Sequence, residues 1–381
     1  MNDFPVWAEI DLKAVAHNVA QVKSLLGPQC TLMAVVKADA YGHGMSEVAA
    51  AALENGASAL GVARLCEAVE LRARGVDAPV LVLGYTPPSM CGEIVKNNCD
   101  QTVCSYSDAL ALSRAAQSLQ MSVRVHVKID TGMGRLGIDA NGPGSANISE
   151  AIDKALAIIR LPGLKVTGIY THFASSDSSD KSYTRLQFER FMRVIDGVGA
   201  GGAPALVRHA ANSAAIINMP ETHLDMVRAG ISLYGLYPSA GVDRGRVDLK
   251  PAMSFKSRIV QVKSVPAGYR ISYGSTYETS KPTTLGVVSV GYADGYSRLL
   301  SSKGQMLVRG RRAPVVGRVC MDLTVLDVSG VDGVSVGDEV VIFGTQDGQA
   351  IAVDEIASML GTINYEVVSS ITHRVPRVYI Y

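Results

Sequence analysis

Lys37 is the first residue whose position suggests chemistry, because it follows the apolar run 32–36 and opens the segment 37–44. A lysine that is partly withdrawn from water has a lowered pKa and can form a Schiff base with a carbonyl compound. On position alone, a surface lysine in a loop is the more common interpretation. The rest of the sequence has to decide between the two.

A second signal lies in residues 123–130, where valines alternate with charged residues. Strand alternation puts the charged side chains on one face, namely Arg124, His126, Lys128 and Asp130. If the valines pack under helices, this charged row points into a barrel, where buried charges need partners or a function. The alternative is an edge strand with one face exposed to solvent. This is difficult to reconcile with a parallel sheet whose two faces are covered by helices.

Polar residues also follow other apolar runs, in the segments 131–135, 170–172, 209–213 and 226–232. Ser213 opens a short predicted helix, and the amides of Gly230 and Ile231 are expected to be free at a turn. Hydroxyls and free amides together form cradles for phosphate. A lone His172 is more often a satisfied core residue, but the four segments together predict a site for a phosphate-bearing cofactor.

The first ~240 residues alternate short apolar runs with helical patterns, which is typical of repeated βα units. About eight units fit a (β/α)₈ barrel, whose active site lies at the carboxyl ends of the strands. An open doubly wound sheet competes, because periodicity does not show closure. After Pro251, alternating strands between Gly and Pro turns predict a mostly antiparallel β domain with one short helix at 354–360. We therefore predict an α/β chain with a barrel over residues 1–245 and a C-terminal β domain over 246–381.

Composition narrows the classes of partner. The 381 residues carry a net charge of +1, with 48% apolar and 19% charged residues, so nucleic acid and anionic membranes are not expected partners. The N-terminus does not resemble a signal peptide, and no apolar run approaches the ~18–20 residues that cross a bilayer. The six cysteines have no CxxC spacing, which predicts reduced thiols, no metal site and a cytoplasmic protein.

Taken together, these segments resemble the alanine racemase family over essentially the whole chain. Nine ordered segments carry the resemblance: AVVKADAYGHG at 34–44, KIDTGMGRLG at 128–137, and the segments 170–174, 211–213, 227–231, 272–274, 291–295, 318–322 and 362–366. A match of this extent in both predicted domains identifies the chain as a member of that family.

The resemblance implies a barrel enzyme that carries pyridoxal 5′-phosphate (PLP) as an aldimine on Lys37. It implies that the phosphate-binding groups are Tyr41, Ser213, Gly230, Ile231 and Tyr365, with Asn212 nearby. It places Arg228 at the pyridine nitrogen, with His172 beside it and supporting Tyr273. Because arginine stays protonated, the ring nitrogen would stay unprotonated, which favours racemisation over transamination.

The resemblance also implies the substrate side of the site. Arg135 lies near the phenolic oxygen of the cofactor and the substrate carboxylate, and Met321 gives a backbone contact to substrate. Lys128 matches a lysine that is often carbamylated and then supports Arg135. Tyr292 and Tyr365 narrow the entrance in members specific for alanine.

The reaction implied is the interconversion of L- and D-alanine, which supplies D-alanine for peptidoglycan in the cell wall. Removing the α-proton from one face and returning one on the other needs two bases. Lys37 would serve D-alanine and Tyr273 would serve L-alanine. Because Tyr273 and Met321 reach the other subunit's site in this family, a homodimer is implied.

Three other classes of PLP-binding protein could share parts of this pattern. A racemase of broader specificity, for serine or a basic amino acid, is the closest alternative, but such enzymes usually carry a secretory signal. A PLP-barrel decarboxylase should have a glycine-rich phosphate loop and a cysteine-bearing acidic motif late in the chain, which we do not find. A non-catalytic PLP carrier protein would lack the β domain.

Overall fold

The computed structural model describes residues 3–142 and 146–381, and it divides into two compact units. The barrel unit comprises residues 15–40 and 45–250. The β unit comprises the N-terminal residues up to Ala14, residues 41–44 and residues 251–381. The predicted domains, 1–245 and 246–381, stay predictions; the compact units divide at residue 250 and place the residues up to Ala14 and residues 41–44 with the β unit.

Strand pairing explains why the N-terminus lies with the β unit. Strand β1 (Val6–Asp11) pairs antiparallel with β11 (Met253–Val265) and parallel with β20 (Arg377–Ile380). The chain then enters helix α1 (Leu12–Ser24), where Oδ1 of Asp11 accepts a hydrogen bond from the Ala14 amide at 2.9 Å. This is the capping role expected of an aspartate at a helix start.

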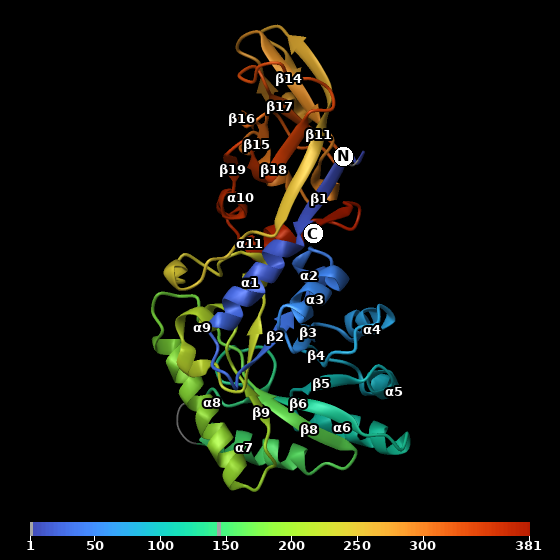
Figure 1. Ribbon diagram of the computed structural model, residues 1–381, viewed down its shortest axis with the longest axis vertical. Coiled ribbons are helices and arrows are strands. Elements are labelled where there is room, and N and C mark those ends of the chain that lie inside the picture. The colour runs from blue at the N-terminus through green and yellow to red at the C-terminus, as the bar shows by residue number, and fades with distance from the viewer. Residues whose placement is uncertain (1–2, 143–145) are drawn as a thin grey trace. The chain divides into compact units, whose positions relative to one another are not determined.

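Eight parallel strands form the sheet of the barrel unit, in the order β10-β2-β3-β4-β5-β6-β8-β9 (Figure 1). They are β2 (Thr31–Val35), β3 (Ala59–Val62), β4 (Val80–Val82), β5 (Cys99–Val103), β6 (Val123–Asp130), β8 (Leu164–Tyr170), β9 (Val207–His209) and β10 (Met226–Ala229). Backbone hydrogen bonds from Asp225 N to Arg208 O (3.1 Å) and from Arg228 N to Ala211 O (3.0 Å) join the two ends. The sheet is therefore a nearly closed barrel, and the open-sheet alternative is excluded.

Helices follow the strands of the barrel unit, as the βα pattern predicts. They are α3 (Met45–Glu54), α4 (Leu65–Ala73), α5 (Cys91–Lys96), α6 (Tyr106–Ser118), α7 (Ala146–Ile159), α8 (Ser182–Ala200) and α9 (Ser213–Asn218), with the short strand β7 (Ile138–Asp139) after β6. Ser105 caps α6, because its hydroxyl oxygen accepts a hydrogen bond from the Asp108 amide at 3.0 Å.

The β unit is mostly antiparallel, as predicted (Figure 1). Its main sheet runs β16-β15-β18-β11-β1-β20, and β14 and β17 extend from β11. Besides β1, β11 and β20, the strands and α-helices of this unit are β12 (Arg270–Ile271), β13 (Tyr277–Glu278), β14 (Thr283–Val288), β15 (Gln305–Val308), β16 (Arg311–Pro314), β17 (Thr324–Asp327), β18 (Glu339–Gln346), β19 (Gln349–Ile351), α10 (Val353–Leu360) and α11 (Asn364–Ser369).

Strands β15 and β16 form a hairpin, because Arg309 and Gly310 both have positive φ, at 50° and 70°, as a two-residue hairpin turn requires. Helix α11 follows α10, although one helix was expected here; the left-handed Gly361 ends α10 and separates the two. Across the described parts of the chain, helices with the length and apolar character to span a bilayer are absent.

Candidate active site

Arg228 lies at the centre of the barrel interior. It extends from β10, is 3% exposed, and donates from Nη1 to Nδ1 of His209 at 2.9 Å. Its Nη2 donates to the carbonyls of Thr171 (2.7 Å) and Ala210 (2.9 Å) and lies 3.3 Å from Nδ1 of His172. These acceptors are all neutral, and burial lowers the pKa of Arg228 to about 10. These hydrogen bonds fix the position of the guanidinium. None of the partners in these bonds is a carboxylate, so they do not neutralise its charge.

Lys128 is the second buried cation. It lies on β6, is 5% exposed, and its Nζ stands 5.4 Å from the centre of the Tyr170 ring. Burial, followed by the charge of Arg135, lowers the pKa of Lys128 to about 8. A lysine in this state is neutral for about a tenth of the time at pH 7, compared with well under a thousandth for an exposed lysine.

Lys37 begins a turn of unusual backbone conformation. Ala38, Asp39, Ala40 and Tyr41 all have φ between 52° and 54°, a left-handed run that costs L-residues roughly 1–2 kcal/mol each. Strain of this kind persists where surrounding contacts over-determine it, which is common at active sites. Burial, followed by the charge of Arg135, lowers the pKa of Lys37, and Glu67 opposes the effect.

Two carboxylates hold the left-handed turn. Oε1 of Glu67 accepts from the Ala38 amide at 2.6 Å, and its Oε2 accepts from the amides of Ala63 (2.7 Å) and Arg64 (3.0 Å). Oδ1 of Asp39 accepts from the Met45 amide at 2.8 Å, at the start of α3. Glu67 therefore ties the residue after Lys37 to the N-terminus of α4.

The change Glu67→Gln is expected to loosen this turn. The amide NH₂ of glutamine would face backbone donors, so we expect a loss of about 1–2 kcal/mol in the free energy of unfolding. Removal of the negative charge should also lower the pKa of Lys37 further, so the limb of the pH–rate profile that belongs to Lys37 should move to lower pH. Glu70→Gln, on the exposed side of the same helix, is the matched control. Equal effects of the two changes would contradict the role given to Glu67.

Asp130 organises the loop that carries Arg135. Its Oδ1 accepts from the amides of Gly132, Met133 and Gly134, at 2.8–3.1 Å, and its Oδ2 accepts from the Arg135 amide at 2.8 Å. Burial alone would raise the pKa of Asp130, but these four donors outweigh it and lower the pKa. The carboxylate of Asp130 is thus engaged by the backbone amides of its own loop.

Ser213 forms the hydroxyl part of a small polar cluster. Its Oγ accepts from the amides of Gly230 (2.9 Å) and Ser232 (3.4 Å) and from the Ser232 hydroxyl (3.0 Å). The Gly230 amide was expected to be free, but it donates a hydrogen bond to Ser213 within this cluster. Ile231 begins the turn η3 (Ile231–Tyr234) and is fully buried. Asn212 caps α9 and accepts from the Ser176 hydroxyl at 2.8 Å.

Positive charge exceeds negative charge in this part of the barrel. Burial lowers the pKa of His172 well below its usual value, and four cations lower it further, namely Arg228, Arg135, Lys128 and Lys37. The carboxylates that raise the pKa values of Lys37 and Lys128 are Glu67 and Asp130, and both are already held by backbone amides. Arg228 and Lys128 are buried, Lys37 is half-buried and Arg135 is exposed, and a cluster of cations of this kind is suited to an anionic ligand. The residues present therefore fit a phosphate- and carboxylate-bearing cofactor and substrate.

The β unit holds the other predicted site residues. The rings of Tyr41 and Tyr365 lie 6.1 Å apart between centroids, and burial raises the pKa of Tyr41. Nε of Arg377 donates to the Gly42 carbonyl at 3.0 Å, which fixes the segment 41–44 in this unit.

Three further predicted residues are exposed on the β unit. Tyr273 is 70% exposed, Met321 is 52% exposed and Tyr292 is 40% exposed. Tyr292 N donates to Cys320 O and Ala293 N donates to Met321 O, both at 3.0 Å, so the segments of Tyr292 and Met321 are joined. Oγ of Ser272, beside Tyr273, lies 3.4 Å from Sγ of the same Cys320.

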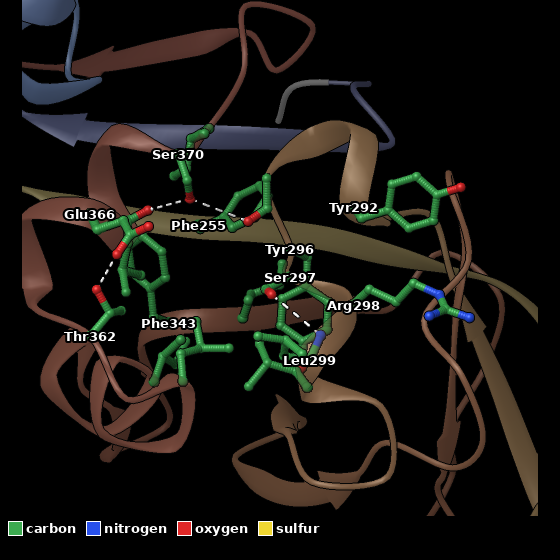
Figure 2. A pocket seen from close by; sticks show the side chains of 17 residues that line it. Phe255, Tyr292, Tyr296, Ser297, Arg298, Leu299, Phe343, Thr362, Glu366 and Ser370 are labelled. Atoms are coloured by element: carbon green, nitrogen blue, oxygen red, sulfur yellow. Dashed lines mark hydrogen bonds between the residues drawn. The ribbon is translucent and has the colours of Figure 1, made fainter. Parts of the chain in front are cut away.

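The β unit also contains a cavity of about 400 Å³ behind Tyr292 (Figure 2). Its walls include Phe255, Phe343 and Leu299, and the Glu366 carboxylate points toward the Thr362 hydroxyl, which donates to it. Arg298 is the one cation among its described lining residues. A mostly apolar cavity without a lysine does not suit a carbonyl-phosphate cofactor, so we assign the site to the cation cluster of the barrel.

Sequence reasoning did not single out Glu67 or the carbonyl of Thr171. The spacing of Arg64 and Glu67, three residues apart before an apolar helical run, is the position where a capping carboxylate sits and could have suggested the first. A carbonyl has no sequence signal, because every residue carries one.

A nearly closed parallel barrel with a lysine at the end of β2, buried cations and a serine–amide cluster defines a barrel-type lysine enzyme that uses a phosphate-bearing carbonyl cofactor. Comparison with known proteins narrows this class. The family model for the N-terminal domain of alanine racemase matches residues 10–238, and the model for its C-terminal domain matches residues 252–379. The chain belongs to the alanine racemase family.

Individual relatives agree with this assignment. The alanine racemase of Desulfosudis oleivorans is 64% identical over 380 residues, covering 100% of this chain and 97% of that protein. Among solved structures, the alanine racemase of Clostridium difficile 630 has a TM-score of 0.93 at 40% identity, covering 100% and 97% of the two chains. The enzyme of Bacillus anthracis with bound L-Ala-P has a TM-score of 0.91 at 35% identity, covering 100% and 96% of the two chains.

Proposed function

We propose that the protein is an alanine racemase that interconverts L- and D-alanine and uses PLP attached to Lys37. The observations that carry this proposal are the surplus of positive charge around Lys37 and the family membership over residues 10–238 and 252–379. When bound, PLP supplies a carbonyl that condenses with amines and a ring that acidifies the adjacent C–H bond. Side chains of the protein bind and orient the cofactor and the substrate and move the α-proton.

Binding and orientation are divided among several groups. Ser213, Gly230 and Ile231 would hold the phosphate, with Asn212 nearby, and the family resemblance adds Tyr41 and Tyr365 to the phosphate-binding groups. Arg228 would hold the pyridine nitrogen, and Nδ1 of His172 lies 3.3 Å from Nη2 of Arg228. Because arginine does not give up its proton readily, it would donate a hydrogen bond to that nitrogen without protonating it. A cofactor with an unprotonated nitrogen would be a weaker electron sink, so Arg228 would favour return of the proton to carbon.

Two bases move the α-proton. Nζ of Lys37 takes the proton of D-alanine, and the lowered pKa of Lys37 leaves more of its amine free to do so. Oη of Tyr273 takes the proton of L-alanine on the opposite face. Arg135 holds the substrate carboxylate, Met321 contacts the substrate through its backbone, and Tyr292 narrows the entrance.

The active form is proposed to be a homodimer in which Tyr273 and Met321 serve the partner's site. The exposure of Tyr273, Met321 and Tyr292 on joined segments of the β unit supports this, because large apolar and aromatic side chains gathered on one surface are typical of an interface. The six cysteines, which are all unpaired, support a reducing compartment such as the cytoplasm. A role in D-alanine supply for the cell wall follows from the activity.

A panel of amino acids tests the proposed reaction. We expect rapid racemisation of alanine and slower turnover of serine and of basic amino acids, measured by chiral chromatography from each enantiomer. Equal rates for alanine and lysine would favour the broader-specificity alternative. An absence of racemisation by PLP-loaded protein would refute the proposal.

Lys128 is proposed to react with CO₂ and form a carbamate that supports Arg135. A carbamate forms only from the neutral amine, and a pKa of about 8 leaves about 300 times more neutral amine at pH 7 than a lysine at 10.5 does. The reaction replaces a cation with an anion, so repulsion of Arg135 becomes a charge-assisted hydrogen bond.

Lys128→Ala is expected to lower kcat/KM by about 10–100-fold, the usual effect of losing a group that orients a substrate-binding residue. Added acetate or chloride should restore part of the activity by replacing the lost negative charge. Lys165→Ala, on the exposed part of the neighbouring strand β8, is the control. A ¹³C spectrum of the holoenzyme under ¹³CO₂ should show the carbamate; absence of that signal, with no rescue by acetate, would contradict the proposal.

A further inference from the structure

A line of four side chains runs from Arg228 to Asp100 in the barrel unit, and the first three of them are buried. Nη1 of Arg228 on β10 lies 2.9 Å from Nδ1 of His209 on β9, and Nε2 of His209 lies 2.9 Å from Nδ1 of His126 on β6. Nε2 of His126 lies 3.5 Å from Oδ2 of Asp100 on β5. His209 is fully buried and His126 is 5% exposed. Nothing in the proposed reaction uses His126 or Asp100.

The donor-only chemistry of arginine sets the direction of every bond in this line. A guanidinium has no acceptor, so Nδ1 of His209 must carry the lone pair and its Nε2 the proton. That proton points at Nδ1 of His126, which must therefore accept, so the proton of His126 lies on Nε2. The latter faces Asp100, an acceptor. The four groups thus admit one consistent arrangement with both rings neutral.

Other features of the barrel hold the line in place. A Cβ on Gly168 of β8 would lie 2.4 Å from Nδ1 of His126, so the glycine leaves the space that the ring occupies. The ring of Tyr170 stacks on His209 with centroids 4.6 Å apart and an angle of 9°. At the far end, Nε of Arg124 donates to Oδ1 of Asp100 at 2.6 Å, which keeps that carboxylate charged and oriented.

We propose that His126 and Asp100 are positioning residues that fix the tautomer of His209 and thereby hold Arg228 in place. Asp100 accepts the only proton of neutral His126, which forces that ring to accept from His209, and His209 in turn accepts from Arg228. With the opposite tautomer, two N–H groups would face each other at the Arg228 contact. The mechanistic consequence rests on the proposed role of Arg228 at the pyridine nitrogen.

The preference for racemisation over transamination should therefore depend on His126 and Asp100, which lie outside the proposed binding site. A displaced Arg228 would shield the pyridine nitrogen less reliably from protonation. The result would be more half-transamination, in which alanine leaves as pyruvate and its amino group stays on the cofactor as pyridoxamine phosphate. The yield of pyruvate per racemisation event is thus a readout that a loss of stability alone does not move.

Two substitutions of His126 distinguish the effect of its hydrogen bonds from the effect of its packing. His126→Gln retains an acceptor toward His209 and a donor toward Asp100, whereas His126→Leu removes both. We expect the leucine variant to give about 10-fold more pyruvate per racemisation event, the size of effect usual for removal of a supporting hydrogen bond, and the glutamine variant to stay near wild type. Ser113→Ala is the matched control, because Ser113 is buried and donates to the Pro162 carbonyl, away from the line.

The tautomers can be read directly in the wild-type holoenzyme. The chain has 7 histidines, few enough to assign by ¹⁵N–¹H correlation of ¹⁵N-histidine-labelled protein. We expect His209 and His126 both to be neutral with the proton on Nε2. A proton on Nδ1 of His209, or equal pyruvate yields from the glutamine and leucine variants, would overturn the proposal. Failure of the wild type to racemise alanine would refute the proposed function and leave the tautomer result standing on its own.

Discussion

Lys37→Ala is expected to abolish racemisation in both directions, with a fall in kcat of about 10⁴-fold or more. The change removes the group that binds the cofactor covalently and one of the two bases, and each of these contributions is large by itself. The lowered pKa of Lys37 and the left-handed turn that begins beside it indicate a side chain held for chemistry and not for stability. Racemisation is measured by chiral chromatography from each enantiomer.

The assignment of Lys37 can be separated from a general loss of structure. Borohydride reduction of the wild-type holoenzyme followed by peptide mapping should place the pyridoxyl group on Lys37. Lys154→Ala is a suitable control, because Lys154 is a surface lysine of α7 whose Nζ lies 2.7 Å from Glu150. A pyridoxyl label on Lys128 would show that the roles of the two buried lysines have been exchanged.

Strand β6 shows where sequence reasoning succeeds. Its alternation of valine with charged residues predicted one face toward the helices and one toward the barrel interior, and the contacts of His126 with His209 and of Lys128 with Tyr170 lie on that inner face. The period of a strand depends on local geometry alone, so one sequence suffices to predict it. The (β/α)₈ class was predictable for the same reason, because it repeats one local unit.

The left-handed turn after Lys37 shows where sequence reasoning does not reach. Ala38 and Ala40 have no preference for positive φ, and the conformation depends on Glu67, whose carboxylate arrives from 29 residues further along the chain. The placement of β1 in the β unit has the same origin. Its partner β11 begins more than 240 residues later, and an apolar strand pattern does not identify its neighbour.

Tyr273→Phe is expected to remove the base for L-alanine while Lys37 still exchanges the α-proton of D-alanine. Racemisation should fall by about 10²–10⁴-fold, the range for loss of a general base. In deuterated water, D-alanine should still exchange its α-proton and L-alanine should not. Tyr273 is 70% exposed, so the change should leave the free energy of unfolding within about 0.5 kcal/mol. Tyr269→Phe, at another partly exposed tyrosine of the β unit, is the control.

Mixed dimers of Lys37→Ala and Tyr273→Phe chains test whether Tyr273 serves the partner's site. Each variant alone should be inactive. If Tyr273 acts across the dimer, a mixed dimer contains one site with the intact Lys37 of one chain and the intact Tyr273 of the other. Random exchange of equal amounts makes half of the dimers mixed, so activity should return to about a quarter of the wild-type value. If both bases came from the same chain, no combination would contain an intact pair, and the mixture would stay as inactive as its components.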